Sequence, residues 1–280
     1  MNPGTLTPGS MPYFKTKDGC RLFYETFGVE PLKPAVVFLN GTTQTTVHWR
    51  PQALYFKKEY QILLYDARAQ GKSEVGQLPL TLDIHVADLF NLLVHIGLEK
   101  ALLVGLSHGA HVALAMAAKN PSRVDRLVLC SMAAEPSARS RTALQLWGKI
   151  LRGEGLEAMT RAALPTIFGE AYLAKNRRIL DKMVTAFATR NRADALLAHL
   201  DAMMRYPSPS LHSATIRQPT LVISGDQDPL VSSDGAARLA ALCRGTHRLL
   251  PQTGHTVSFE APDLFNQTLA AFFKSHMQPD

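Results

Sequence analysis

Short apolar stretches recur along the chain, and they are apolar at nearly every position instead of at alternate positions. Continuous apolar runs of this length are typical of central strands buried on both faces of a sheet. The chain has five of them, at Ala35–Leu39, Gln61–Tyr65, 101–104, 124–129 and 219–224. Two further strands are predicted at Arg21–Phe27, which is rich in aromatic residues, and at Thr246–Leu250.

Helical patterns separate these strands. In 82–96 the apolar residues stand at 82, 86, 89, 93 and 96, which is the spacing of one helix face. Further helices are predicted at 107–118, 233–243 and 262–276. Strands that alternate with helices predict an α/β fold, with a mostly parallel central sheet flanked by helices on both faces.

The alternation stops at residue 135 and resumes after residue 211. Between them lie long amphipathic helical stretches without a convincing strand. We therefore expect a helical cap, or lid, at 135–211, inserted into a core made of 12–134 and 212–280. Residues 1–11 are polar, contain two prolines and two glycines, and are expected to form a flexible N-terminus. In such sheets ligands bind at the carboxyl ends of the strands, so we expect functional residues directly after each strand.

One of these positions carries the sequence Gly105-Leu106-Ser107-His108-Gly109, which fits G-x-S-x-G. The motif follows a predicted strand and opens a predicted helix. In that context it forms a sharp turn, a nucleophile elbow, that exposes a strained serine. The glycines on either side let the backbone turn without a Cβ clash. Ser107 is the candidate nucleophile.

A serine hydroxyl needs a base to take its proton. His255 follows the last predicted strand, on a loop before the final helix, and is the best candidate. His108 and His111 are close to Ser107 in sequence, but we interpret their side chains as polar residues at the start of a helix.

The base needs an acceptor that fixes its tautomer. Asp226 and Asp228 both follow the strand at 219–224. We favour Asp228, because Asp226 is better placed for a local hydrogen bond in the turn. Glu135, after the strand at 124–129, is a distant third candidate. The order Ser107, Asp228, His255 along the chain completes a candidate catalytic triad.

An acyl-transfer site also needs donors for the developing oxyanion. One is expected to be the backbone N–H of His108, the residue after the nucleophile. The other is expected to be the backbone N–H of Thr42, on the loop after Ala35–Leu39, where Gly41 permits a close approach to the substrate. Both residues would complete the oxyanion hole through their backbones.

The composition bears on whether the chain spans a membrane, is secreted or binds a cofactor. The chain has 280 residues, 46% of them hydrophobic, and no apolar run of the roughly 20 residues that span a bilayer. Its first 20 residues lack the apolar segment of a secretory signal, and its three cysteines are far apart, so we expect a cytoplasmic protein. No phosphate loop, dinucleotide fingerprint or metal-ligand spacing is evident, so we expect no cofactor and no metal.

With these residues assembled, the chain resembles the α/β-hydrolase superfamily over roughly residues 20–276. The resemblance rests on Asn40-Gly41, D-x-R-x-x-G-x-S at 66–73, the Ser107 elbow, Gly225-x-x-Asp228 and Gly254-His255. It implies an α/β-hydrolase fold, and the 66–73 loop and helical cap are similar to those of lactonases, carboxylesterases and C–C hydrolases. Residues 40–46 also resemble bacterial 3-hydroxyacyl transferases, which lack the elbow glycine present here as Gly105.

Three functions follow as hypotheses. The first is a cofactor-free serine hydrolase that cleaves a carboxylic ester, lactone or thioester through an acyl-enzyme on Ser107. The second is an acyltransferase acting on acyl thioesters, of the 3-hydroxyacyl type. The third is a non-catalytic ligand-binding protein. The acyl group would lie under the cap, where substrate-binding candidates are Trp147, Phe168, Phe187 and Met203.

The net charge of +7 is uneven. Residues 135–211 hold 12 Lys and Arg against 7 Asp and Glu, whereas the rest of the chain holds 18 against 16. The excess is not a basic stripe with interleaved aromatic residues, so we expect no nucleic acid. It forms either solvated helix faces or a patch at Arg177, Arg178 and Lys182 that guides an anionic substrate or an acidic carrier protein.

Overall fold

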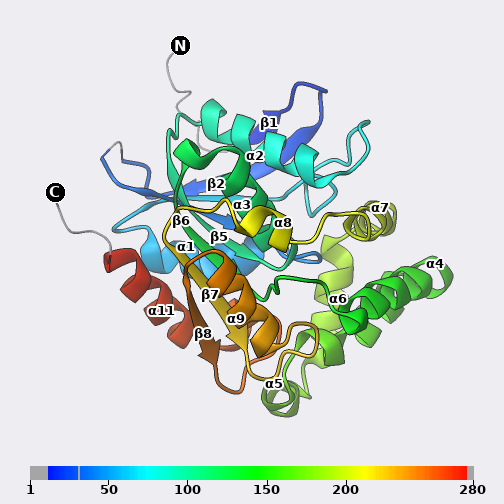
Figure 1. Cartoon of the computed structure of the whole chain (residues 1–280). Helices are drawn as coiled ribbons and strands as arrows, with labels where there is room; N and C mark the ends of the chain where they lie inside the picture. The colour runs from blue at the N-terminus through cyan, green and yellow to red at the C-terminus, as the bar shows by residue number, and fades with distance from the viewer. Residues whose placement is uncertain (1–11, 31, 276–280) are drawn as a thin grey trace.

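In the computed structural model, which describes residues 12–30 and 32–275, eight strands form one sheet (Figure 1). The predicted flexible segment at 1–11 lies outside the described residues. The strands are β1 (Tyr13–Lys15), β2 (Arg21–Phe27), β3 (Ala35–Leu39), β4 (Gln61–Tyr65), β5 (Ala101–Leu106), β6 (Val124–Cys130), β7 (Thr220–Gly225) and β8 (Thr246–Leu250).

The sheet has the order β1-β2-β4-β3-β5-β6-β7-β8. β2 pairs antiparallel with β1 and β4, and the remaining neighbours pair parallel. The predicted α/β-hydrolase fold, with a mostly parallel sheet flanked by helices, is confirmed. β1 was not predicted, because three residues are too few to show a pattern. β5 extends two residues beyond its predicted end, so that Ser107 follows the strand directly.

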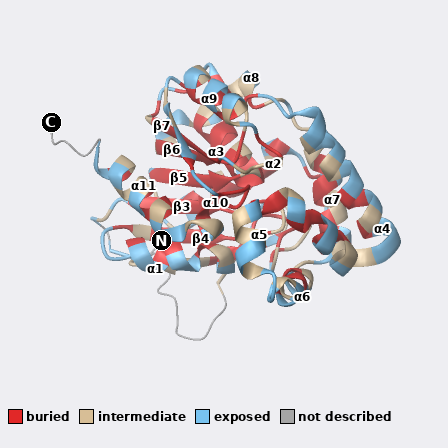
Figure 2. Cartoon of the chain, turned by 90° about the horizontal axis from the view of Figure 1, so that it is seen from below, coloured by how far each residue is buried: buried red, intermediate tan, exposed pale blue. Residues whose placement is uncertain are grey.

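Two helical layers cover the sheet. Consecutive side chains of β3 alternate between them: Val37 joins the core beneath α2 (Leu82–His95), α3 (His108–Lys119) and α9 (Ser233–Leu242). Val36 and Phe38 join the core beneath α1 (Arg50–Phe56) and α11 (Pro262–Lys274). Figure 2 shows the buried strands between these layers. Both faces of the strand are apolar because both are covered.

Residues 135–211 contain four longer helices and no strand. These are α4 (Ala138–Ile167), α5 (Glu170–Asn176), α6 (Leu180–Arg190) and α7 (Ala193–Met203), here called the cap helices. They lie together to one side of the sheet, where α4 packs against α6 and α7 (Figure 1). α4 is broken at Gly155, whose φ of 85° a residue with a side chain rarely adopts.

Four short helices complete the fold: η1 (Thr46–Trp49), η2 (Pro121–Arg123), α8 (Ser210–Ser213) and α10 (Val257–Glu260). Among the described residues, no helix is both long enough and apolar enough to cross a membrane.

Candidate active site

Ser107 stands at the sharp turn between β5 and α3, with φ of 53° and ψ of −112°. Such a conformation is strained for a residue with a side chain. Gly105 and Gly109 allow this tight turn, because neither position has room for a side chain. A Cβ on Gly105 would lie 2.3 Å from the carbonyl oxygen of Gly109, and one on Gly109 would lie 2.3 Å from that of Leu39. The turn therefore presents Ser107 to the pocket above the sheet edge.

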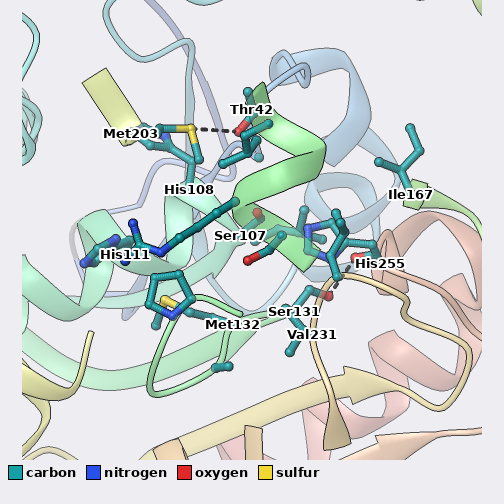
Figure 3. A pocket seen from close by; sticks show the side chains of 18 of the residues that line it. Thr42, Ser107, His108, His111, Ser131, Met132, Ile167, Met203, Val231 and His255 are labelled. Atoms are coloured by element: carbon teal, nitrogen blue, oxygen red, sulfur yellow. Dashed lines mark hydrogen bonds between the residues drawn. The ribbon is translucent and has the colours of Figure 1, made fainter. Parts of the chain in front are cut away.

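His255 lies in the same pocket on the loop between β8 and α10, and Figure 3 shows it close to Ser107. Its Nδ1 is 2.8 Å from Oδ2 of Asp228, whose side chain is fully buried. The backbone N–H groups of Leu230 and Val231 donate to the other carboxylate oxygen at 2.8 and 3.0 Å. Asp228 is thus held rigidly, and Nε2 is the ring nitrogen of His255 left for chemistry.

Burial lowers the pKa of His255, but the charge and hydrogen bond of Asp228 act against it. The net effect raises the pKa above its ordinary value of 6.5. A ring that gains basicity while shielded from water is suited to accepting a proton.

The other two acidic candidates have different partners. Asp226 accepts a hydrogen bond from the backbone N–H of Thr253 at 3.2 Å, which connects the loops after β7 and β8. Glu135 lines the pocket but accepts a hydrogen bond from the hydroxyl of Ser210. Of the three carboxylates, Asp228 is the one paired with His255.

Thr42 and His108, the candidates for the oxyanion hole, both line the pocket. The amide of His108 is the first of α3, and the first amides of a helix have no intrahelical acceptor. The Thr42 hydroxyl donates to Sδ of Met203 at 3.2 Å, and the Gln70 side-chain amide donates to the carbonyl oxygen of Gly41 at 2.9 Å. These contacts brace the loop after β3 beside the elbow.

The 66–73 loop is held by buried polar contacts. Asp66 accepts hydrogen bonds from Asn40 and from the backbone of Thr46, at 3.2 and 2.7 Å. Burial raises the pKa of Asp66 to about 6, despite these bonds. Arg68 is fully buried and paired with Asp18 and Asp88 at 2.7 and 2.8 Å, which makes it structural.

The pocket is a cavity of about 170 Å³ between the sheet edge and the cap helices. Trp147, Phe187 and Met203 lie on its wall, as do Ile167 and Leu144. Phe168 is not among its lining residues, contrary to expectation. It stacks on Tyr172 of α5 with ring centroids 4.7 Å apart and lies 6.1 Å from the ring of Phe259 on α10, so it packs where the cap helices meet the core.

The predicted basic patch lies apart from the residues that line the pocket. Arg177, Arg178 and Lys182 are exposed, and none of them lines the pocket. The cation at the pocket rim is Arg141, near the start of α4, which the sequence did not single out.

Glu260 is a further residue that the sequence did not reveal. Its carboxylate accepts from the backbone N–H groups of Gly254 and Thr256, on both sides of His255, at 2.9 and 3.0 Å. It also accepts from Gly169 between α4 and α5, at 2.8 Å. Glu260 therefore connects the His255 loop to the cap helices. No pattern in the sequence distinguishes it from other acidic residues of a short helix.

Comparison with known proteins agrees with this architecture. A family model described as the alpha/beta hydrolase fold matches residues 34–262. The chain is 27% identical to 3-oxoadipate enol-lactonase 2 of Acinetobacter baylyi, covering 94% of this chain and 99% of that protein. It is 28% identical to the putative carbamate hydrolase RutD of Shigella flexneri, covering 84% and 90%.

Among solved structures, the enol-lactonase from Burkholderia xenovorans LB400 aligns with a TM-score of 0.85 and 26% identity, covering 94% of this chain and 99% of that one. MGS-M2, an alpha/beta hydrolase from a deep-sea metagenome library of the Medee basin, aligns with a TM-score of 0.89 and 26% identity, covering 96% and 99%. The family match spans most of the chain, and the chain belongs to the alpha/beta hydrolase family.

Proposed function

We propose that this protein is a serine hydrolase that cleaves a small carboxylic ester or lactone through an acyl-enzyme on Ser107. The observation that carries the proposal is the Asp228–His255 pair, 2.8 Å apart, in the pocket onto which the strained Ser107 opens. The names of two relatives, an enol-lactonase and a putative carbamate hydrolase, support hydrolysis of a carbonyl compound.

In the first half-reaction, Nε2 of His255 takes the proton of Ser107 while the serine oxygen attacks the carbonyl carbon. The negative charge that develops on the carbonyl oxygen is stabilised by the backbone N–H groups of His108 and Thr42. The tetrahedral intermediate then collapses, and the proton on His255 passes to the leaving alkoxide. Asp228 keeps the ring oriented and stabilises its positive charge.

In the second half-reaction, His255 takes a proton from water, which attacks the acyl-enzyme carbonyl. Collapse returns that proton to Ser107 and releases the acid. With a lactone, the alcohol freed in the first step stays joined to the acyl group, so that one hydroxy acid leaves.

The pocket favours a small, largely apolar acyl group. A cavity of about 150 Å³ accommodates a benzene ring, and this one is of similar size. Its wall is mainly apolar, whereas Arg141, Glu135 and Ser140 lie on the stretch that begins the cap helices.

Acyl transfer receives no separate support from the 40–46 segment. Asn40 donates to the carbonyl oxygen of Tyr65 at 2.9 Å, and Thr46 donates to Asp66. These two donors have partners inside the chain, although Oδ1 of Asn40 is buried without one, and neither donor requires an acyl acceptor.

The test is Ser107-dependent turnover of short p-nitrophenyl esters and of a δ-lactone, with labelling by a fluorophosphonate probe. Ser107→Ala should lower kcat/KM by at least about 10⁴-fold, since loss of a triad nucleophile removes the covalent path. Ser140→Ala, another serine of the pocket, is the matched control and should keep wild-type rates. Wild-type turnover by Ser107→Ala would contradict the proposal.

A further inference from the structure

Three buried imidazoles from distant parts of the chain meet next to the pocket. His85 comes from α2, His108 begins α3, and His199 comes from the cap helix α7. Their exposed fractions are 1%, 2% and 0%. The ring centroid of His108 lies 4.8 Å from that of His85 and 4.3 Å from that of His199.

Within the described residues, none of these rings makes a hydrogen bond of normal geometry. Both nitrogens of His85, of His108 and of His199 are buried and unpaired. Buried polar atoms in native proteins are nearly always paired, so an unpaired group calls for an explanation, such as an ion that the site holds. Six such nitrogens in one cluster point to a ligand.

The geometry fits a metal ion. One nitrogen from each ring lies within 4.8 Å of the corresponding nitrogens of the other two. Tetrahedral Zn²⁺ with Zn–N distances of about 2.0–2.1 Å holds its ligand nitrogens about 3.3 Å apart. Adjacent rings would therefore approach each other by at most about 1.5 Å, shared between two side chains. We propose that His85, His108 and His199 bind one divalent transition-metal ion of the zinc type.

The surroundings suit such an ion. Arg68, the cation that acts on His85, is neutralised by its ion pairs with Asp18 and Asp88. The backbone carbonyl of Asn40 lies beside the His108 ring and is an acceptor for the N–H that a metal-bound imidazole leaves free.

Tyr206 is the second polar neighbour of the cluster. Its buried hydroxyl is unpaired, and its ring lies 6.0 Å from that of His108. Three histidines leave the fourth coordination position to water or hydroxide, for which this hydroxyl is a nearby hydrogen-bond partner.

An ion at this site would join the cap helices to the core. His199 belongs to α7, whereas His85 and His108 belong to helices that cover the sheet. It would also hold His108, whose backbone follows Ser107. The role is structural: the metal fixes α7 over the pocket and steadies the elbow, and it takes no part in the acyl chemistry.

The test is metal content and stability, neither of which requires activity. The full chain is unfolded with a chelator, refolded with or without Zn²⁺, desalted and examined by inductively coupled plasma mass spectrometry. Wild type should hold about one Zn²⁺ per chain, and its Tm should rise, because an ion that binds only the folded state stabilises it. His85→Phe and His199→Phe should lower the affinity more than about 100-fold, beyond the cost of an outer-shell change.

His95→Asn is the matched control. His95 lies on α2 like His85 but outside the cluster, and its variant should bind as wild type does. Two results would overturn the proposal. One is wild-type protein that takes up no zinc and shows no shift in Tm. The other is stoichiometric zinc that persists in both His85→Phe and His199→Phe, which would place the ion elsewhere.

Discussion

His255 and His108 flank Ser107 in the pocket, and both are buried, with exposed fractions of 7% and 2% (Figure 3). Their charged and polar neighbours differ: His255 pairs with the carboxylate of Asp228, whereas His108 packs against the imidazoles of His85 and His199. Burial lowers the pKa of both rings, but Asp228 outweighs it at His255 and raises the pKa there. At His108 burial and the neighbouring imidazoles act in the same direction, and the pKa falls well below its ordinary value.

The difference separates two uses of one side chain. A buried imidazole beside a carboxylate can take a proton and keep it through a reaction step. A buried imidazole without an anion stays neutral, which is the form that binds a metal. The neighbouring charge, more than burial, therefore decides which histidine can act as a base.

Removing the anion should have the largest effect. Asp228→Asn leaves His255 buried without a charged partner, which makes its environment resemble that of His108. We expect kcat to fall by about 10⁴-fold with little change in the fold, as an amide in this position favours the wrong tautomer of the ring. Steady-state ester hydrolysis measures kcat, and circular dichroism checks that the fold is retained. A variant with wild-type kcat would show that Asp228 is not needed for catalysis.

The next largest effect is expected on stability, when the buried cation Arg68 is removed from its ion pairs. Arg68→Met leaves Asp18 and Asp88 without their cation, and breaking a buried pair in this way costs about 3–5 kcal/mol of unfolding free energy. Urea denaturation measures the loss. Arg152→Met, which breaks an exposed pair with Asp201, is the control and should cost about 1 kcal/mol or less. Equal losses of unfolding free energy in the two variants would show that burial does not determine how much each ion pair stabilises the protein.

Glu260→Gln should have a smaller effect on stability and a measurable effect on the pKa of His255. The variant weakens the acceptor for Gly169, Gly254 and Thr256, so we expect a loss of about 1–3 kcal/mol in stability. The Glu260 charge also helps to raise the pKa of His255, so the acid limb of the activity profile should move to lower pH. Glu170→Gln, at an exposed position in the cap helices, is the control. An unmoved acid limb would show that Glu260 does not act on the base.

The smallest effect is expected at Thr42. If its backbone N–H serves the oxyanion, Thr42→Val removes only the hydroxyl contact with Met203. We expect kcat/KM to stay within about fivefold of wild type, because one such hydrogen bond contributes about 1 kcal/mol or less. A fall of 100-fold, typical of a lost oxyanion donor, would show that the hydroxyl and not the amide stabilises the charge.

Local patterns were enough to predict the sheet, the elbow and the order of the three triad candidates. Continuous apolar runs identify central strands, and the topology of a parallel sheet brings the residues after those strands to one edge. That is why Ser107, Asp228 and His255 could be placed together without knowing any contact between them.

Contacts that depend on how the cap helices sit on the core could not be predicted. His85 and His199 are 114 residues apart on helices with no pattern that joins them, so the sequence suggested no metal site. Helical periodicity likewise does not say which face of the cap meets the pocket. It therefore did not separate Phe168, which packs between α5 and α10, from Phe187, which lines the pocket.

The pH dependence of Ser107 phosphonylation tests whether His255, paired with Asp228, is the base that activates Ser107. It reports the ionisation of that base without a second half-reaction. The rate constant for a fluorophosphonate, followed by intact mass between about pH 5 and 9, should rise as His255 loses its proton. The midpoint should lie above the ordinary 6.5, since Asp228 raises the pKa of His255. A rate that does not change over this range, or a midpoint well below 6.5, would contradict it.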